Sequence, residues 1–236
     1  MVAYMKRYDA GNIAARELLD ELRADSGDPR FARNHGFCGD WTAGLDTLHI
    51  RTGEPNPPIE SELPWPEWLP QNRQKGYLGY LQQYTHNINL LRWFLDDEAE
   101  VKVHSAHIDP EDGLSGIVVL DINGCLCTIE SGGMSYHGWD EHTQVYFKHG
   151  WVRADSPPLL LRNEPAHLEV YIKKGNDQPA VRREIFPVGG RVWAYKAEIQ
   201  HFVESVQNNT PFRSPAADAA RDAAAIEAIY RKSLGV

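Results

Sequence analysis

Apolar residues along this chain follow two different spacings, one typical of helices and one typical of strands. Spacings of three and four residues predict helices over four stretches, at 12–27, 78–95, 192–206 and 214–234. Asn12 is the expected N-cap of the first helix, and Ser214 followed by Pro215 marks the start of the last.

Short alternating or β-branched runs predict strands between the second and third helices. These runs cover residues 101–103, 117–122, 126–129, 143–148, 168–173 and 183–186, and residues 2–8 form a further, weaker run. Consecutive strands without helices between them pair antiparallel, because a parallel pair needs a crossover connection. The predicted fold class is therefore α+β: a large, mostly antiparallel open β-sheet with helices packed on one face.

The other face of this sheet also carries bulky side chains. Along the strands Val145 and Phe147 fall on one face, whereas Tyr146 and Tyr171 fall on the other. Aromatic residues on an open face indicate a partner, but single exposed tyrosines are also common on protein surfaces. Both interpretations remain open at this point.

A stretch without periodicity, residues 30–73, interrupts the pattern. Six prolines between residues 45 and 75 exclude a regular element there, whereas Trp65 and Trp68 are too apolar to be left in water. We expect a long Pro- and Trp-rich loop over 45–75 that packs down on the domain and has a functional role, because long loops inside compact domains usually do.

Composition excludes several classes of partner. The 236 residues carry a net charge of −9, which argues against nucleic acid, because phosphate binding needs clustered Lys and Arg. No segment approaches the ~20 apolar residues of a membrane span, and the N-terminus lacks the apolar region of a signal peptide. We therefore expect neither a nucleic-acid nor a membrane partner.

The cysteines and histidines suggest no metal or disulfide chemistry. Cys38, Cys125 and Cys127 do not form a disulfide framework, which favours a reducing cytoplasm. A metal or redox site at 125–127 would need a second cysteine pair, and the other interpretation is two small core residues. His142 and its histidine neighbours match no zinc template, so we expect no metal ligands in this chain.

Motifs for nucleotides and for nucleophilic catalysis are absent from the sequence. There is no GxGxxG after a strand, no GxxxxGK[ST], no GxSxG and no HExxH. A dinucleotide needs a glycine turn against a helix N-terminus. We therefore expect no cofactor-binding residues in this chain and no Rossmann domain.

The densest polar cluster lies on the predicted helix 78–95. Gln82, His86 and Asn89 share one helical face, and an imidazole between two amides suits hydrogen bonding to a polyhydroxylated ligand or acid–base work on a hydroxyl. The alternative is a helix histidine bonded to a neighbouring strand. Trp139 and His137 are candidate walls for a sugar ring, because aromatic faces pack on the apolar side of sugars.

Three segments of the sequence resemble the Gfo/Idh/MocA oxidoreductases, which include glucose–fructose oxidoreductases and inositol dehydrogenases. The helix 77–95, YLGYLQQYTHNINLLRWFL, is similar to the family helix with the motif Gly-x-x-x-Asp-x-Gly-x-His-x-x-Asp. VAYMKRYD at 2–9 resembles the first strand after the family's nucleotide-binding domain, and residues 194–234 resemble its closing helix pair. The likeness therefore touches the beginning, middle and end of the chain.

The resemblance implies an N-terminal Rossmann domain that binds NAD or NADP, followed by an α+β domain whose open sheet mediates dimer or tetramer contacts. The family histidine, which lies near the reacting hydroxyl, falls on His86. The chain departs from the motif because Gln82 and Asn89 stand at the aspartate positions and Tyr84 at a glycine position. Loss of a carboxylate beside His86 puts the family's proton relay in doubt.

We therefore expect residues 1–236 to be the substrate-binding and oligomerisation domain of a cytoplasmic NAD(P)-dependent enzyme acting on a sugar, polyol or cyclitol. The family's catalytic lysine has no counterpart here, so the chain alone is expected to be inactive, as a fragment, a split gene product or one partner of two. His86 would assist the hydroxyl proton, Gln82 and Asn89 would orient the substrate, and the pocket would be lined by Tyr84, Arg7, Trp139 and His137. The alternatives are a non-catalytic carbohydrate-binding or assembly module and, more remotely, a nicotinamide-independent elimination with His86 as base.

Overall fold

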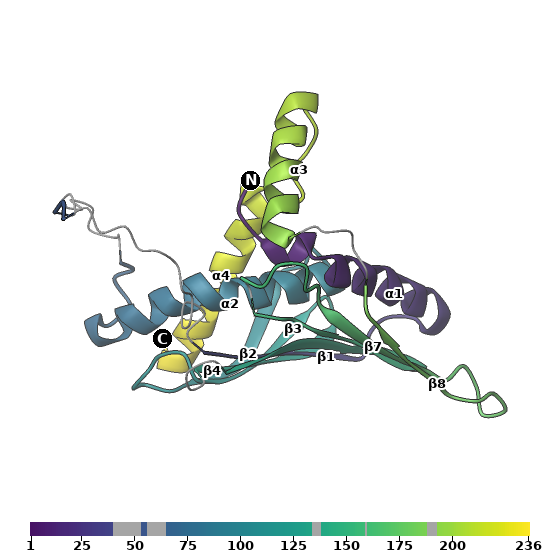
Figure 1. Ribbon diagram of the computed structural model, residues 1–236. Coiled ribbons are helices and arrows are strands. Elements are labelled where there is room, and N and C mark those ends of the chain that lie inside the picture. The colour runs from purple at the N-terminus through teal and green to yellow at the C-terminus, as the bar shows by residue number, and fades with distance from the viewer. Residues whose placement is uncertain (40–52, 56–64, 134–137, 159, 188–192) are drawn as a thin grey trace.

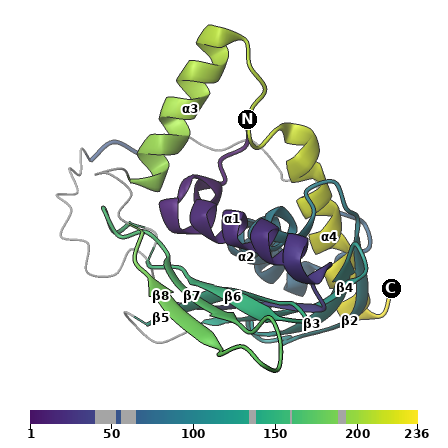
Figure 2. The ribbon, with the colours of Figure 1, turned by 90° about the vertical axis from the view of Figure 1, so that its right-hand side faces the viewer.

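The computed structural model describes residues 1–39, 53–55, 65–133, 138–158, 160–187 and 193–236. They form one eight-stranded sheet with helices on one side (Figures 1 and 2). The α-helices are α1 (Ala10–Ser26), α2 (Gln74–Leu95), α3 (Ala194–Asn208) and α4 (Ala216–Leu234), and the 3-10 helices are η1 (Met5–Tyr8) and η2 (Gln71–Arg73). The strands are β1 (Phe31–Cys38), β2 (Val101–Ile108), β3 (Gly116–Ile122), β4 (Cys125–Gly133), β5 (Trp139–Tyr146), β6 (Gly150–Asp155), β7 (His167–Ile172) and β8 (Val181–Ile185).

The strand order is β2-β3-β4-β1-β5-β6-β7-β8, and every neighbouring pair is antiparallel except β1 with β4. Helices α1, α2 and α4 pack on the same face of this sheet, whereas α3 stands away from it and contacts η1 (Figure 2). The predicted α+β class, with a mostly antiparallel open sheet and helices on one face, is confirmed.

Strand β1 is the main element that the sequence pattern missed. Its buried positions hold Ala32, Asn34, Gly36 and Cys38, which do not stand out as an apolar alternation. Small residues are needed here because α2 crosses closely: a Cβ on Gly36 would lie 2.8 Å from Nδ2 of Asn87. Asn34 is fully buried but satisfied, since its Nδ2 donates to Oγ1 of Thr143 at 2.7 Å.

Other boundaries also differ from the prediction. The weak run 2–8 is not a strand: Met5–Tyr8 is the 3-10 helix η1. Asp9, not Asn12, caps α1, because its side chain accepts from the Asn12 backbone N–H at 3.0 Å. Strand β6 was not predicted, and Ser214 donates its hydroxyl to the Val2 carbonyl instead of capping α4.

The described end of the Pro- and Trp-rich loop packs on the domain. Trp68 meets Tyr77 edge-on, with ring centroids 5.8 Å apart, and the Arg231 guanidinium lies 4.5 Å from the centre of the same indole. Leu69 is buried beside them. Most of the predicted insertion 45–75, including 45–52 and 56–64, lies outside the described residues.

A buried ionic network joins η1, α2 and α4. Arg92 contacts Asp222 at 2.6 Å and Asp218 at 3.0 Å, and Arg7 contacts Asp218 at 2.8 Å. Asn89 connects the two halves, because its Oδ1 accepts from Nε of Arg7 at 2.6 Å and its Nδ2 donates to Asp222 at 2.7 Å. Arg7 also pairs with Asp97 at 3.1 Å, so two guanidinium groups face three carboxylates, and the network fixes the turn that carries Lys6.

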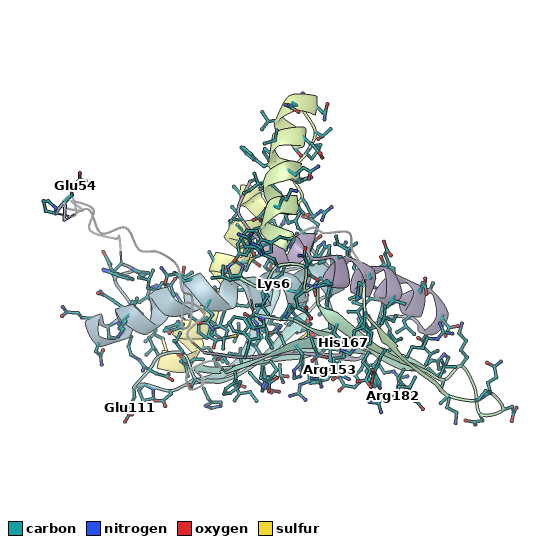
Figure 3. All side chains as sticks on the ribbon, viewed as in Figure 1. Lys6, Glu54, Glu111, Arg153, His167 and Arg182 are labelled. Carbon is teal, nitrogen blue, oxygen red and sulfur yellow. The ribbon has the colours of Figure 1, made fainter. Side chains whose placement is uncertain are left out.

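A row of aromatic side chains crosses the face of the sheet opposite the helices. The register places Phe31, Tyr146, Trp151 and Tyr171 opposite one another on successive strands β1, β5, β6 and β7. The Trp151 and Tyr171 rings are stacked with centroids 6.1 Å apart, and Leu126, 45% exposed, extends the row onto β4. This open-face aromatic row has Tyr146 and Tyr171 on the face where the sequence predicted them. Two basic residues also lie along the sheet and are labelled in Figure 3: Arg153 on β6 and Arg182 on β8.

None of the helices that the structure describes combines the length and apolar character needed to cross a bilayer.

Candidate functional site

A cavity of about 510 Å³ lies where η1, α2 and α3 meet the ends of β1 and β5. We call it the α2 cavity. Its polar and ionisable lining consists of Lys6, Cys38, Gln82, Gln83, His86, Asn87, Glu141, Tyr195 and Glu198, and its other lining residues are Ala3, Met5, Gly79 and Trp139. The volume is in the range of small-molecule sites, roughly 300–1,000 Å³.

Helix α2 contributes His86 and Gln82 from successive turns of one face. Burial, with a smaller contribution from the Lys6 charge, lowers the pKa of His86 to about 4, so the imidazole is neutral at pH 7. The Tyr4 ring meets it edge-on, with centroids 5.7 Å apart. Nδ1 of His86 is buried without a hydrogen-bond partner among the described residues.

Lys6 and Glu141 form a buried ion pair at the cavity wall. Figure 3 places Lys6 between the sheet and the base of α3. Asn87 donates from Nδ2 to Oε1 of Glu141 at 3.0 Å and to Oδ1 of Asn34 at 2.8 Å, which ties the pair to the centre of the sheet. The second oxygen of Glu141, Oε2, is buried and has no partner among the described groups.

Glu198 on α3 brings a second carboxylate to the cavity. The residue is only 4% exposed, and burial raises its pKa to about 6, opposed in small part by the backbone N–H of Tyr4. No cation contributes to this shift, and Oε1 of Glu198 has no partner within the described part of the chain. A buried carboxylate without a cation is unusual, because desolvation of an unpaired charge costs several kcal/mol.

Three lining residues therefore present buried polar atoms with no partner among the residues that the structure describes: His86, Glu141 and Glu198. An unmet buried polar atom costs about 1–3 kcal/mol, so such atoms are normally satisfied by water or by a ligand. All three can accept a hydrogen bond, which makes the cavity complementary to a molecule rich in hydroxyl or amino donors.

Trp139 supplies an apolar wall to the cavity. Its Nε1 donates to the Ser156 carbonyl at 3.1 Å, which leaves the indole ring as the group that faces a ligand. The predicted neighbour His137 lies outside the described residues.

The remaining predicted site residues do not line the cavity. Arg7 and Asn89 belong to the buried network with Asp218 and Asp222 and are not among the residues that line the α2 cavity. Tyr84 donates to the Gly36 and Gly132 carbonyls at 3.2 and 3.1 Å, and its hydroxyl accepts from the Gly132 N–H. Asn89 lies about one turn beyond His86 along α2, where its amide bonds to Arg7 of η1 and Asp222 of α4 instead of reaching the cavity.

Sequence reasoning missed Lys6, Glu141 and Glu198. Lys6 had a detectable signal, since it interrupts an apolar run, and Glu198 lies between Tyr195 and Ile199 beside the apolar stripe of its helix. Glu141 had none, because nothing in an alternating strand marks which acidic residue is buried.

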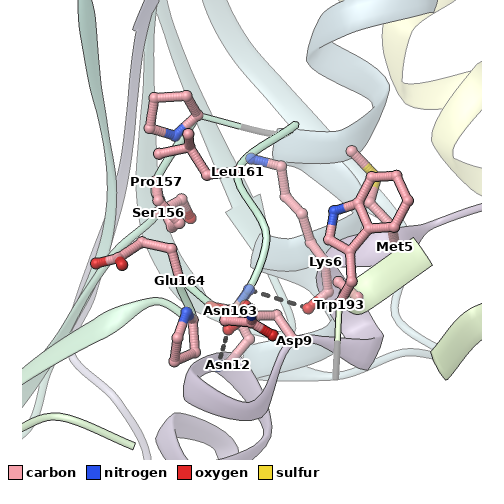
Figure 4. A pocket seen from close by; sticks show the side chains of 13 residues that line it. Met5, Lys6, Asp9, Asn12, Ser156, Pro157, Leu161, Asn163, Glu164 and Trp193 are labelled. Atoms are coloured by element: carbon pink, nitrogen blue, oxygen red, sulfur yellow. Dashed lines mark hydrogen bonds between the residues drawn. The ribbon is translucent and has the colours of Figure 1, made fainter. Parts of the chain in front are cut away.

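A second, smaller pocket adjoins Lys6 on the side of α1 (Figure 4). It holds about 40 Å³ and is lined by Met5, Asp9, Trp193 and residues 156–158, 161 and 163–165. Asp9 is already engaged there, accepting from the backbone N–H groups of Asn12 and Ala166 at 3.0 Å. This pocket has room for a few water molecules only, so it is too small for a sugar-sized ligand.

Neither pocket contains an evident metal site. Within the described ranges, no group of three or more His, Cys, Asp or Glu residues could hold a metal ion. The three cysteines are all buried and free.

Comparison with models of known protein families finds no match. Comparison with solved structures finds oxidoreductases. The chain superposes over its full length on aldose-aldose oxidoreductase from Caulobacter crescentus, solved with glycerol, with a TM-score of 0.63 and 17% identity over 62% of that chain. It also matches levoglucosan dehydrogenase, solved with NADH and levoglucosan, with a TM-score of 0.67 and 15% identity over 64% of that chain.

A third match is a putative myo-inositol dehydrogenase from Sinorhizobium meliloti, with a TM-score of 0.59 and 19% identity, covering all of this chain and 63% of that one. The chain thus spans somewhat under two thirds of the length of these structures. The resemblance to the Gfo/Idh/MocA oxidoreductases is confirmed at the level of the fold, which is that of their C-terminal domain.

Proposed function

We propose that this chain is the substrate-binding and oligomerisation half of a nicotinamide-dependent oxidoreductase that acts on a sugar, polyol or cyclitol hydroxyl. The observation that carries the proposal is the α2 cavity, in which a neutral imidazole and two carboxylates present buried atoms without protein partners. The structurally similar aldose-aldose oxidoreductase, levoglucosan dehydrogenase and putative myo-inositol dehydrogenase support the same class of substrate.

His86 is the group assigned to the reacting hydroxyl. Oxidation of a carbinol removes the hydroxyl proton as the hydride leaves carbon. The neutral imidazole can accept a hydrogen bond from that hydroxyl and so assist removal of its proton. Gln82 and Trp139 would hold the ring of the substrate.

Arg7, Asn89 and Tyr84 receive positioning roles in this proposal. Arg7 and Asn89 hold η1 against α2 and α4, and Tyr84 joins α2 to the ends of β1 and β4. They keep Lys6 and His86 in place without contacting the substrate.

The nucleotide is assigned to a doubly wound domain of the complete enzyme. Among the described strands only β1 and β4 run parallel, and α2, β2 and β3 lie between them in the chain, so these elements form no βαβ unit to cradle a pyrophosphate. A nicotinamide bound beside the cavity would take up the hydride.

Oligomerisation is proposed through the open-face aromatic row. Phe31, Tyr146, Trp151 and Tyr171 lie half-buried on a face that no helix covers, and charged residues of both signs flank them, such as Arg153 with Asp155 at 2.6 Å. A surface of this kind suits a two-fold contact with a second copy. The free, buried cysteines support the further proposal of a cytoplasmic location.

Ligand binding by wild type and His86→Ala tests the central assignment. Calorimetric titration with glucose and myo-inositol should give at least a ~10-fold weaker affinity for the variant, because a buried hydrogen bond to the ligand is lost. His104→Ala is the matched control, since His104 is exposed on β2. Equal affinity of wild type and His86→Ala would exclude the imidazole from the site.

A non-catalytic carbohydrate-binding module is the second candidate. Gln82 and Asn89 replace the family carboxylates, and a His86 pKa of about 4 makes the imidazole a weak base. An assay of the complete protein with NAD+ or NADP+ and the sugars that bind distinguishes the two functions. Absorbance growth at 340 nm supports the oxidoreductase, whereas binding without reduction supports the module.

A further inference from the structure

The two carboxylates of the α2 cavity have different surroundings. Glu141 is compensated, because the Lys6 ammonium group forms an ion pair with it and Asn87 donates to the same oxygen. Glu198 reaches the cavity from α3 and is equally buried, at 4% exposed, yet no lysine or arginine within the described chain pairs with it.

The charges of the lining therefore do not balance. Lys6 and Glu141 cancel, and His86 is neutral at pH 7. An ionised Glu198 leaves the cavity with a net charge of about −1. At pH 7 most of this carboxyl is ionised, since its pKa of about 6 lies below that pH.

Only some ligands relieve this imbalance. A neutral hydroxyl can donate one hydrogen bond to Oε1 of Glu198 but leaves the charge buried and uncompensated. An ammonium group donates as well and cancels the charge, and such charge-assisted bonds are about twice as strong as neutral ones. Hydroxyls on the same molecule would meet Oε2 of Glu141 and Nδ1 of His86, the other two unpartnered atoms.

We propose that the α2 cavity takes a hydroxylated ring compound with a primary amine, an amino sugar or an aminocyclitol, and that Glu198 binds its ammonium group. This inference rests on the proposed function and narrows its substrate class. It assigns Glu141 and His86 to hydroxyls of the ring and Glu198 to the amine.

Matched pairs of ligands test the assignment. The probes are glucose with glucosamine, and myo-inositol with a monoamino-deoxyinositol, titrated calorimetrically into the chain at pH 7.5. In at least one pair the amine should bind about 10-fold or more tightly than its neutral counterpart. N-acetylglucosamine keeps the nitrogen but not the charge, so it should bind no better than glucose. The pair that responds identifies whether the amine is carried by a sugar or a cyclitol.

Two glutamates on α3 provide the variant and its control. Glu198→Gln should remove the preference for the amine, so that each amine and its neutral counterpart bind the variant within about 3-fold of each other. Glu204→Gln, at an exposed position on the same helix, should retain the preference. Circular dichroism and a melting curve check that each variant is folded.

The outcomes distinguish this inference from the proposed function. Equal binding of amines and neutral ligands, with both weakened by His86→Ala, overturns the ammonium site and leaves the proposed function standing. A preference for the amine that survives Glu198→Gln also overturns the ammonium site. Competition by the cation 1-methylnicotinamide that is as strong as competition by the amine overturns it as well, because this cation lacks hydroxyls. No binding of any of these ligands overturns both.

Discussion

Replacing Asp222 by Asn tests whether the buried ionic network of η1, α2 and α4 stabilises this fold. Asp222 is fully buried, accepts from Nη1 of Arg92 at 2.6 Å and from Nδ2 of Asn89 at 2.7 Å, and helps neutralise two buried guanidinium groups. The amide has the same shape, so no cavity forms. It removes one negative charge and turns a donor toward either Arg92 or Asn89.

The expected loss follows from these contacts. Removal of one partner from a buried ion pair costs about 3–5 kcal/mol, and the remaining amide oxygen keeps one acceptor, so we expect about 3 kcal/mol. For a chain of this length, each kcal/mol lowers Tm by about 2–4 °C, which gives a decrease of about 6–12 °C. Urea unfolding followed by circular dichroism should show a lower midpoint with an unchanged m-value.

Glu227→Gln is the matched control. Glu227 lies on the same helix and also pairs with an arginine, Arg231, at 2.9 Å, but both side chains are about two-fifths exposed. Exposed pairs contribute about 0–1 kcal/mol, so this variant should unfold within about 1 kcal/mol of wild type. If Asp222→Asn loses no more than Glu227→Gln, the network adds nothing beyond an ordinary surface pair and the reasoning fails.

Three further predictions concern the cavity, the helix packing and the open face. The pKa of His86 is depressed to about 4, so its contribution to stability is present above its unfolded value of 6.5 and is lost as pH falls from there toward 4. Between pH 7.5 and 4.5, the free energy of unfolding measured in urea should therefore fall by about 2–3 kcal/mol less in His86→Gln than in wild type. Gly76→Ala should destabilise the fold by about 1–3 kcal/mol, because its Cβ would lie 2.6 Å from the Gly113 backbone. Gly79→Ala should be near neutral, because its Cβ would meet only the flexible end of the Leu114 side chain. Equal melting temperatures for the two variants would contradict this packing. Trp151→Glu should shift the sedimentation profile toward the monomer, whereas Ala24→Glu, at an exposed position on α1, should leave it unchanged. An unchanged profile for Trp151→Glu would exclude the aromatic row as the interface.

Local patterns predicted most of the elements correctly. Helix α2 has its apolar residues at regular helical spacing, and the turn-bounded runs of β3, β4 and β7 are β-branched or alternating. Strand β1 could not be found in this way, because contact with α2 selects small or polar residues at its buried positions, including Asn34 and Gly36. Its insertion between β4 and β5 also creates the parallel pair.

The candidate site was only partly predictable for a related reason. Gln82 and His86 were found together because one helical face is a short-range property of the sequence. Asn89 belongs to the same expected cluster, yet it forms hydrogen bonds with Arg7 and Asp222, which are both remote in sequence, and is therefore part of the buried network.

The sequence by itself determined the α+β class, the helix that carries His86 and the absence of a glycine-rich phosphate motif, because these depend on residues close together in the chain. Only the tertiary structure decided which charges reach the cavity. Lys6 and Glu141 are 135 residues apart, and Glu198 comes from a third element. Their surroundings then set their chemistry: among the described residues Glu141 is paired with a lysine, whereas Glu198 has no cation beside it. No local sequence pattern encodes that difference.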